Sequence, residues 1–319
     1  GKGAYARVYA SSEQYIAIKA LPLKRFACSV REIILCNACR HSNIIEIHGI
    51  QYTASHMLIY MQRYHTDLAK YISAHGPVPV KLIEPLMLGL LRGLQYIHTR
   101  GMIHGDIKPP NLLIDIESMD LVICDFGISS VASEVNHSSL VQTCNYRAPE
   151  INIRRKTSKH TSSIDIWSTG CVAFEMIAGR ELISYRENVE DTTIYMSEIL
   201  GIEIGKNRTS RQKLLREANV KFIIDKLWRR IQDTNPARTI DVLINIVVVM
   251  ANCLQSNPKH RPTADIAIRM LVQTYDSIPS TSIIDIGDVD LYTTFICGLT
   301  EDILGLCTLE CLKLADLCI

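Results

Sequence analysis

The sequence lacks the features that mark secreted, membrane-spanning or strongly charged proteins. Its 34 basic and 33 acidic side chains nearly cancel, so no global field draws the 319 residues to nucleic acid or to an anionic membrane. The longest apolar run, Ile246–Leu254, is too short to span a bilayer and predicts a buried helix. No secretory signal peptide is recognisable, and the 11 cysteines include several in apolar, helix-like contexts. We therefore expect reduced thiols in a cytoplasmic protein, with a nuclear location as the alternative.

Hydrophobic patterning divides the chain into a small β-rich part and a larger helical part. In the first part, runs such as YIAIKAL and HMLIYM predict short strands interrupted by one helix. Beyond about Asp67 the apolar spacing becomes helical, and a long apolar helix is predicted to end at Gly101. The expected fold class is α+β with two lobes: a β-rich N-lobe (residues 1–61) and a helical C-lobe (residues 65–275), joined by a hinge at residues 62–64. A cleft between two lobes is a common ligand site.

The chain opens on GKGAYARVY, a glycine-containing turn that leads into a strand. Glycines in such a turn let the backbone approach phosphates closely, although Ala6 occupies the place of a third glycine. On its own the stretch also fits an ordinary hairpin turn. The strand that follows ends in Lys19, whose ammonium group can pair with phosphate oxygens, and Glu32 on the next predicted helix can hold that lysine in place. We expect the whole turn to bind nucleotide phosphates, with its first strand truncated: Gly1, Lys2, Gly3, Ala4, Tyr5 and Ala6.

The stretch HGDIKPPN, from His104 to Asn111, places a carboxylate and a carboxamide five positions apart. Asp106 can orient and deprotonate a hydroxyl nucleophile, and Lys108 can neutralise a phosphoryl group during its transfer. Asn111 and Asp125, the latter in DFG, can bind Mg²⁺, which prefers oxygen ligands. These motifs, in this order and spacing, predict Mg²⁺-dependent phosphoryl transfer from a triphosphate.

Together these motifs resemble the eukaryotic protein kinase family over about residues 1–275. TCNYRAPE resembles the end of an activation segment, and DIWSTGC resembles the central helix of the C-lobe. REIIL followed by RHSNIIEIHGI, and YRAPE itself, resemble cyclin-dependent and mitogen-activated kinases. DIKPPN resembles serine/threonine rather than tyrosine kinases. The resemblance implies a bilobal kinase fold, ATP and Mg²⁺ as cofactors, and serine or threonine residues of proteins as substrates.

The same resemblance implies roles for residues outside the catalytic loop. Asp165 of the central helix is expected to support the catalytic loop, and Thr143 is expected to contact the catalytic Asp106 and Lys108. A buried ion pair is implied between Glu150 of APE and an arginine further along the chain. That arginine is the one in NPKHRPT: Arg261.

The resemblance also implies an adenine site. Met61 is then the gatekeeper beside the pocket. The backbone of the hinge residues Gln62, Arg63 and Tyr64 is expected to bind adenine. Apolar side chains from both lobes are expected to sandwich the base, although plain core packing would also explain them: Val8, Ala17 and Leu113.

One position departs from the family pattern. Gly105 stands where the family carries an arginine that helps to bind a phosphate on the activation segment. A helix arginine is matched by Arg31, but no arginine or lysine lies between Asp125 and Gln142. We therefore predict that activity does not require phosphorylation of the serines in this segment: Ser129, Ser130, Ser133, Ser138 and Ser139.

None of the groups needed for chemistry is missing, which favours an active kinase. The alternative is a pseudokinase, a scaffold that binds nucleotide or partner proteins without efficient catalysis. A kinase for a small metabolite is a third interpretation, and the full activation segment argues against it. A regulatory protein could bind the apolar stripe Val30–Ile34, although simple packing in the N-lobe is the favoured explanation of that stripe.

The last residues, 276–319, lie beyond the resemblance and are apolar and cysteine-rich. Three interpretations are open: a helix docked on the kinase, a tail that binds a partner, or unrelated sequence joined to the chain. The spacing of their apolar residues favours an amphipathic helix: Ile303, Leu306, Leu309, Leu312 and Leu317.

Overall fold

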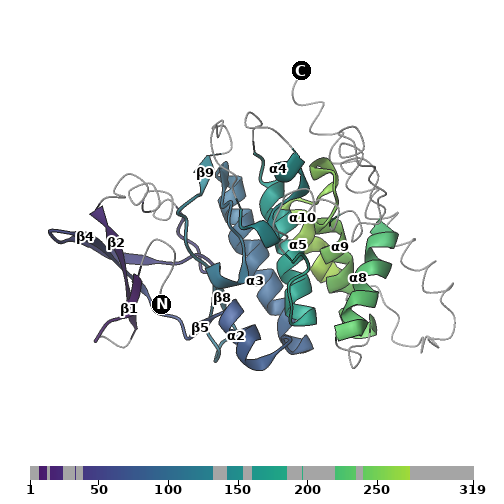
Figure 1. Cartoon of the computed structure of the whole chain (residues 1–319), viewed down its shortest axis with the longest axis horizontal. Coiled ribbons are helices and arrows are strands. Elements are labelled where there is room, and N and C mark those ends of the chain that lie inside the picture. Colours follow the sequence, from purple (N-terminus) through teal and green to yellow (C-terminus); the bar gives the residue numbers. More distant parts are fainter. Residues whose placement is uncertain are drawn as a thin grey trace, which may run out of the picture.

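The structure is a computed structural model that describes residues 7–12, 15–23, 33, 39–131, 142–153, 160–184, 196, 220–234 and 240–273. Figure 1 shows a small sheet at one end of the molecule and a larger body of helices at the other. This arrangement confirms the predicted two-lobed α+β fold. The predicted boundary at residue 275 and the extension 276–319 lie outside the described residues.

The N-lobe contains a four-stranded antiparallel sheet in the order β1-β2-β4-β3. Its register places Val8 opposite Lys19 and Ala17 opposite Met61. Because side chains alternate along a strand and directly paired residues share a face, all four point to the same side of the sheet. The strands are β1 (Arg7–Ala10), β2 (Ile16–Pro22), β3 (Ile47–Tyr52) and β4 (His56–Gln62). The buried core of this lobe includes Leu21, Ile33, Met57 and Ile59.

The C-lobe is built around helix α5 (Ser163–Ala178), in which every residue from Ile164 to Ala178 is buried. A helix buried on all sides must be covered by other helices, and α5 packs against α3 and α9, as Figure 1 also shows. The predicted buried apolar helix is α9, and the predicted long helix is α3, which ends just before Gly101 at a φ of 68°. The described helices of this lobe are α2 (Leu68–His75), α3 (Val80–Thr99), α4 (Pro149–Ile153), α5, α8 (Val220–Thr234), α9 (Ile240–Cys253) and α10 (Ala264–Gln273).

Short strands and turns frame the loops that connect these helices. One small sheet has the order β5-β7-β8, and a second pairs β6 with β9. The catalytic loop runs from β6 to β7, and Asp125 stands two residues after β8, the strand that pairs with β7. The bounds are β5 (Thr66–Asp67), β6 (Met102–Ile103), β7 (Leu112–Ile114), β8 (Leu121–Ile123) and β9 (Ser130–Val131), with 3-10 turns η2 (Pro109–Asn111), η3 (Cys144–Tyr146) and η4 (Pro258–His260).

A segment before β3 fixes the N-lobe to the C-lobe. The backbone of Ile123 accepts a hydrogen bond from Ile45 N and donates one to Asn43 O, both at 2.9 Å. The Asn43 side chain donates to Leu121 O, also at 2.9 Å. Helix α3 approaches this segment at Gly93, where a Cβ atom would lie only 2.7 Å from Ile123 Cδ1. The same Cβ atom would lie 3.0 Å from the backbone oxygen of Asn43, so glycine favours the close approach of α3 to this segment.

Two expectations from composition can be compared with the described residues. Within these ranges no helix is long and apolar enough to cross a membrane. Free thiols among the described cysteines include Cys39, Cys144, Cys171 and Cys253. Burial raises the pKa of Cys39 to about 11 and that of Cys253 to about 12, so these two thiols stay protonated and unreactive at neutral pH.

Candidate active site

Hydrogen bonds attach the catalytic loop to the first turn of α5. Asp165 is fully buried, and its carboxylate accepts hydrogen bonds from the backbone N–H groups of His104 (2.9 Å) and Gly105 (2.8 Å). His98 Nε2 lies 2.9 Å from the same carboxylate. Burial alone would raise the pKa of Asp165, but these hydrogen bonds and the nearby histidines hold it below its usual value. The predicted support of the loop by Asp165 is confirmed.

Asp106 lies at the centre of a cluster of hydrogen bonds. Thr143 donates its backbone N–H (3.1 Å) and its hydroxyl (2.7 Å) to Asp106 Oδ1. Lys108 Nζ lies 2.7 Å from Asp106 Oδ2 and 2.8 Å from Thr143 Oγ1. Asn111 Nδ2 donates to the main-chain oxygen of Asp106 (2.9 Å) and to its Oδ2 (3.2 Å). The predicted contact of Thr143 with Asp106 and Lys108 is confirmed, and these contacts fix the orientation of the Asp106 carboxylate.

A second charged group joins the two lobes. Lys19 of β2 reaches the C-lobe, where its Nζ lies 3.0 Å from Asp125 Oδ1. Partial burial would raise the pKa of Asp125, but the charge and hydrogen bond of Lys19 outweigh it and hold the pKa below its usual value, so the carboxylate is ionised. Glu32, the predicted partner of Lys19, lies outside the described residues.

The oxygens beside this pair suit a magnesium ion. Asn111 uses its amide nitrogen in the bonds to Asp106, so its side-chain carbonyl oxygen is the atom left to face a cation. Asp125 is engaged by Lys19 through Oδ1 and has a second carboxylate oxygen. Mg²⁺ takes few protein oxygens and keeps waters and phosphate oxygens as its other ligands. The donor set therefore fits the ion, although the described residues contain no group of three or more His, Cys, Asp or Glu side chains that would form a complete metal cage.

The predicted adenine site lies between the N-lobe sheet and β7. Val8, Ala17 and Met61 share the face of the sheet that carries Lys19, and Leu113 of β7 is partly buried on the C-lobe side. In the hinge, Arg63 N donates to Tyr15 O at 2.8 Å, so this amide is engaged within the N-lobe. The binding roles of these residues stay predictions, and the phosphate turn, residues 1–6, lies outside the described residues.

Comparison with known families matches residues 1–272 to the protein kinase domain. The chain belongs to the protein kinase family. Among its curated relatives, the mitogen-activated protein kinase HOG1B of Wallemia ichthyophaga is 34% identical over 212 residues, or 63% of this chain and 56% of the relative. Cyclin-dependent kinase 15 of Homo sapiens is 33% identical over 213 residues, or 63% of this chain and 48% of the relative.

A further relative, the mitogen-activated protein kinase HOG1A of Wallemia ichthyophaga, is 30% identical over 278 residues, or 83% of this chain and 72% of the relative. The likeness to cyclin-dependent and mitogen-activated kinases that the motifs indicated is therefore confirmed. The kinase chain spans about half the length of the first two relatives.

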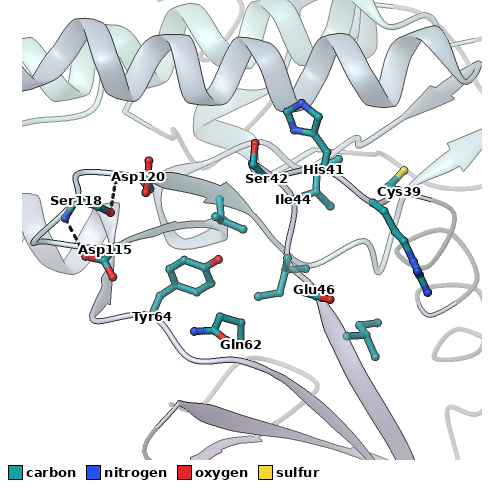
Figure 2. Close-up of a pocket in the computed structure, with 14 residues that line it drawn as sticks. Cys39, His41, Ser42, Ile44, Glu46, Gln62, Tyr64, Asp115, Ser118 and Asp120 are labelled. Atoms are coloured by element: carbon teal, nitrogen blue, oxygen red, sulfur yellow. Dashed lines mark hydrogen bonds between the residues drawn. The ribbon is translucent and has the colours of Figure 1, made fainter.

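Two hinge residues of this kinase, Gln62 and Tyr64, line a cavity of about 640 Å³. Figure 2 shows the Tyr64 ring between the turn that carries Asp115 and the segment that carries His41 and Ile44. Burial, followed by the charges of Asp120 and Asp115, raises the pKa of Tyr64 to about 12, so its hydroxyl is protonated. The Tyr64 side chain lines this cavity, and the predicted contact of its backbone with adenine stays a prediction.

The activation segment of the kinase differs in part from the sequence-based expectation. Ser129 and Ser130, counted among its candidate phosphate acceptors, are 3% and 6% exposed. Ser129 Oγ donates to His104 O at 2.9 Å, and Ser130 belongs to β9, which pairs with β6. These two serines therefore have structural roles. Their burial also makes them inaccessible to a second kinase. The other three serines lie outside the described residues.

The backbone conformation at position 105 gives a structural reason for the presence of glycine there, in addition to its electrostatic effect. The φ of Gly105 is 80°, in the left-handed region where a side chain is strained. The nearest atom to a Cβ built there is Ile128 O at 3.5 Å, so space is available and backbone conformation is the constraint. Glycine adopts this conformation without strain, at the cost of the cation that the family carries at this point.

Sequence patterns did not indicate a role for Gln142, which only marked the end of the stretch without arginine or lysine. Its side chain is buried, and Nε2 donates to Ile164 O (2.9 Å) and to Ser168 Oγ (2.8 Å). Its Oε1 accepts from Ala148 N at 2.9 Å, and its main-chain oxygen accepts from Arg147 Nη2 at 2.9 Å. The residue has a φ of 68°, which is unusual outside glycine. A glutamine in a loop normally faces solvent, so only the tertiary structure reveals this network.

The predicted pair of Glu150 and Arg261 is confirmed. Arg261 Nη1 and Nη2 lie 2.7 Å from the two carboxylate oxygens of Glu150, and both side chains are buried. Arg261 also donates to the backbone oxygens of Gln255 and Ser163. The pair fastens α4, which follows the activation segment, to α5 and to the end of α9.

A buried pair of Glu175 and Tyr146 predicts a pH-dependent stability. Tyr146 Oη donates to Glu175 Oε2 at 2.6 Å, and burial raises the pKa of Glu175 to about 7 even though this hydrogen bond lowers it. A folded-state pKa above the unfolded value of 4.5 means that the stabilisation is complete below about pH 4.5 and is lost as the pH rises through about 7. This group should lower the free energy of unfolding by roughly 3 kcal/mol over that range.

Urea unfolding across about pH 5 to 8 measures the effect of Glu175. The variant Glu175→Gln should flatten the pH dependence, because its amide cannot ionise and still accepts the Tyr146 hydrogen bond. Glu117→Gln, at an exposed position in the turn between β7 and β8, serves as the control and should keep the slope. Equal slopes in both variants would contradict the assignment.

Proposed function

We propose that this kinase domain is an active, ATP-dependent serine/threonine protein kinase. The observation that carries the proposal is the Asp106 cluster, in which Lys108 and Thr143 hold one carboxylate in place. Such a carboxylate is oriented to accept the proton of an alcohol. Asp106 and Lys108 both keep partial exposure to solvent. Because they are not core residues, packing alone does not explain the close contacts between them.

The side chains divide the work of transfer between the two lobes. Asp106 accepts the hydroxyl proton as the substrate oxygen forms a bond to the γ-phosphorus and the bond to the departing diphosphate oxygen breaks. Lys108 offsets negative charge that develops on the phosphoryl oxygens. Asn111 and Asp125 would hold the magnesium ion, and Lys19 would orient the phosphates. When bound, Mg·ATP supplies the phosphoryl group and the metal charge.

A direct assay tests this proposal against the pseudokinase alternative. Radiolabelled ATP and Mg²⁺, incubated with the full chain and generic protein substrates, should yield labelled phosphoserine or phosphothreonine on phosphoamino-acid analysis. Labelled phosphotyrosine alone would overturn the serine/threonine assignment. Nucleotide binding without any transfer would support the scaffold interpretation instead.

We also propose that transfer does not depend on phosphorylation of the activation segment. Gly105 supplies no cation to dock a phosphate, and Ser129 and Ser130 are buried. Replacing Ser133, Ser138 and Ser139 with alanine should therefore leave kcat within about twofold of the unsubstituted chain. A loss of several orders of magnitude would contradict the proposal. Ser129 and Ser130 are left intact because Ser129 hydrogen-bonds the catalytic loop.

A regulatory protein at residues 30–34 is a weaker proposal. Of this stripe the structure describes only Ile33, which is 8% exposed and belongs to the N-lobe core with Met57 and Ile59. Its burial favours packing within the lobe as the role of that residue. Protein substrates are thus the partners that the described site supports best.

A further inference from the structure

One turn of α5 holds both segments that meet at Asp106. Its Asp165 carboxylate binds the backbone of the catalytic loop at His104 and Gly105. One residue before and three residues after Asp165, Ile164 O and Ser168 Oγ accept hydrogen bonds from the side-chain amide of Gln142. The same short stretch of helix therefore fixes the position of the catalytic loop relative to the end of the activation segment.

Gln142 stands directly before the residue that touches the catalytic carboxylate. Thr143, its neighbour, donates both its N–H and its hydroxyl to Asp106 Oδ1. The position of Thr143 relative to Asp106 follows from where Gln142 is fixed, because one peptide unit separates them. Ser168 Oγ extends the network by donating to Tyr146 O at 2.8 Å.

The backbone of Gln142 is held in the left-handed conformation, which is unfavourable for a residue other than glycine. A non-glycine residue at a φ of 68° is held there only when surrounding contacts determine it. Here the contacts are the amide bonds to Ile164, Ser168 and Ala148 and the bond from Arg147 to the main-chain oxygen. The amide uses donors and an acceptor together, so an isosteric carboxylate or an apolar side chain cannot replace it.

We propose that Gln142 is a positioning residue that fastens the end of the activation segment to α5 and so orders Thr143 against Asp106 without a phosphate. The inference rests on the proposed kinase activity. A neutral, buried amide does the ordering that a phosphate with arginine partners would otherwise do. Arg147, a cation close to the segment, is buried and already donates to Gln142 O, so it does not serve as a phosphate dock in this arrangement.

Kinetics of three variants test the role of the amide. After phosphatase treatment the unsubstituted chain should keep its kcat, whereas Gln142→Ala should lower kcat about 100-fold with little change in the KM for ATP. Gln142→Gly accepts the backbone conformation but lacks the amide, and should show a similar loss of kcat. Gln255→Ala removes an equally buried glutamine amide at the end of α9 and should leave kcat unchanged.

Three kinetic results would overturn the inference. Full activity in Gln142→Gly would mean that backbone conformation alone matters. Equal losses in Gln142→Ala and Gln255→Ala would mean that Gln142 acts only through general stability. Loss of activity on phosphatase treatment of the unsubstituted chain would mean that the amide cannot replace a phosphate.

Hydrogen exchange separates a failure of this inference from a failure of the proposed function. In the nucleotide-free protein, peptides covering residues 142–151 and 104–111 should exchange faster in Gln142→Ala than in Gln255→Ala or the unsubstituted chain. If the unsubstituted chain transfers no phosphate but this difference appears, the kinase proposal fails and the positioning role stands. Equal exchange in all three proteins would overturn the positioning role whatever the activity.

Discussion

Replacing Asp106 with asparagine should slow phosphoryl transfer about 1,000-fold. Asparagine keeps the shape of the side chain, so the hydrogen bonds from Thr143 can persist through the amide oxygen. It cannot accept the proton of the substrate hydroxyl, and it removes the ion pair that holds Lys108 at 2.7 Å. Initial rates with saturating Mg·ATP, alongside the affinity for ATP from fluorescence titration, measure the two consequences separately.

The matched control is Asp120→Asn, the same chemical change in the turn after β7. That residue lines the cavity beside the hinge and should leave kcat within about twofold. ATP affinity should stay unchanged in both variants, because the ATP phosphates are assigned to Lys19 and to the metal ligands. Undiminished transfer by Asp106→Asn would refute the role of Asp106 as the base. An equal loss in Asp120→Asn would point to instability instead.

Replacing Arg261 with alanine should destabilise the protein by about 3–5 kcal/mol. Glu150 would be left as a buried carboxylate without its bidentate partner, and the backbone oxygens of Gln255 and Ser163 would lose a donor. The packing of the guanidinium over the Trp167 ring, 5.1 Å from its centroid, would also be lost. Urea midpoints followed by tryptophan fluorescence measure the change.

Arg269→Ala provides the control for this prediction. Arg269 pairs with Asp265 at 2.6 Å, but both side chains are close to half exposed, so the pair contributes at most about 1 kcal/mol. A double variant, Glu150→Gln with Arg261→Met, should be less destabilised than Arg261→Ala, because no unpaired charge stays buried. Equal shifts for Arg261→Ala and Arg269→Ala would show that burial of the pair does not set its strength.

The chemical identity of the site could be predicted because phosphoryl transfer needs few residue types at fixed spacing. Asp106 and Asn111 are five positions apart in one short loop, and their side chains are in contact. The strand period likewise placed Ala17 and Lys19 on one face. Strand pairing was harder to predict, since the position of Met61 opposite Ala17 depends on a register that separate strands do not encode.

Some contacts join residues that lie far apart in the sequence, so the sequence alone could not identify them. Lys19 and Asp125 are 106 positions apart, and the structure shows their ion pair. The predicted pair of Lys19 with Glu32 lies outside the described residues and stays a prediction. Ser130 is buried where β9 pairs with β6, and Ser129 is buried beside His104 O, to which it donates; the sequence indicated neither contact. The sequence also did not indicate that Tyr64 lines the cavity beside the hinge. The direction of a side chain in a connecting segment depends on the packing of both lobes.

By itself, the sequence determined the kinase family, the two-lobed fold and the residues that can carry phosphoryl transfer, because motif chemistry and hydrophobic period are local properties. Gly105 was also visible there, together with the loss of a phosphate-binding cation. Only the tertiary structure decided how the activation segment is held, because the amide of Gln142 finds its partners 22 and 26 residues away on α5. Hydrogen bonds of that range form only when packing brings a helix and a loop together and excludes the water that would otherwise satisfy the amide.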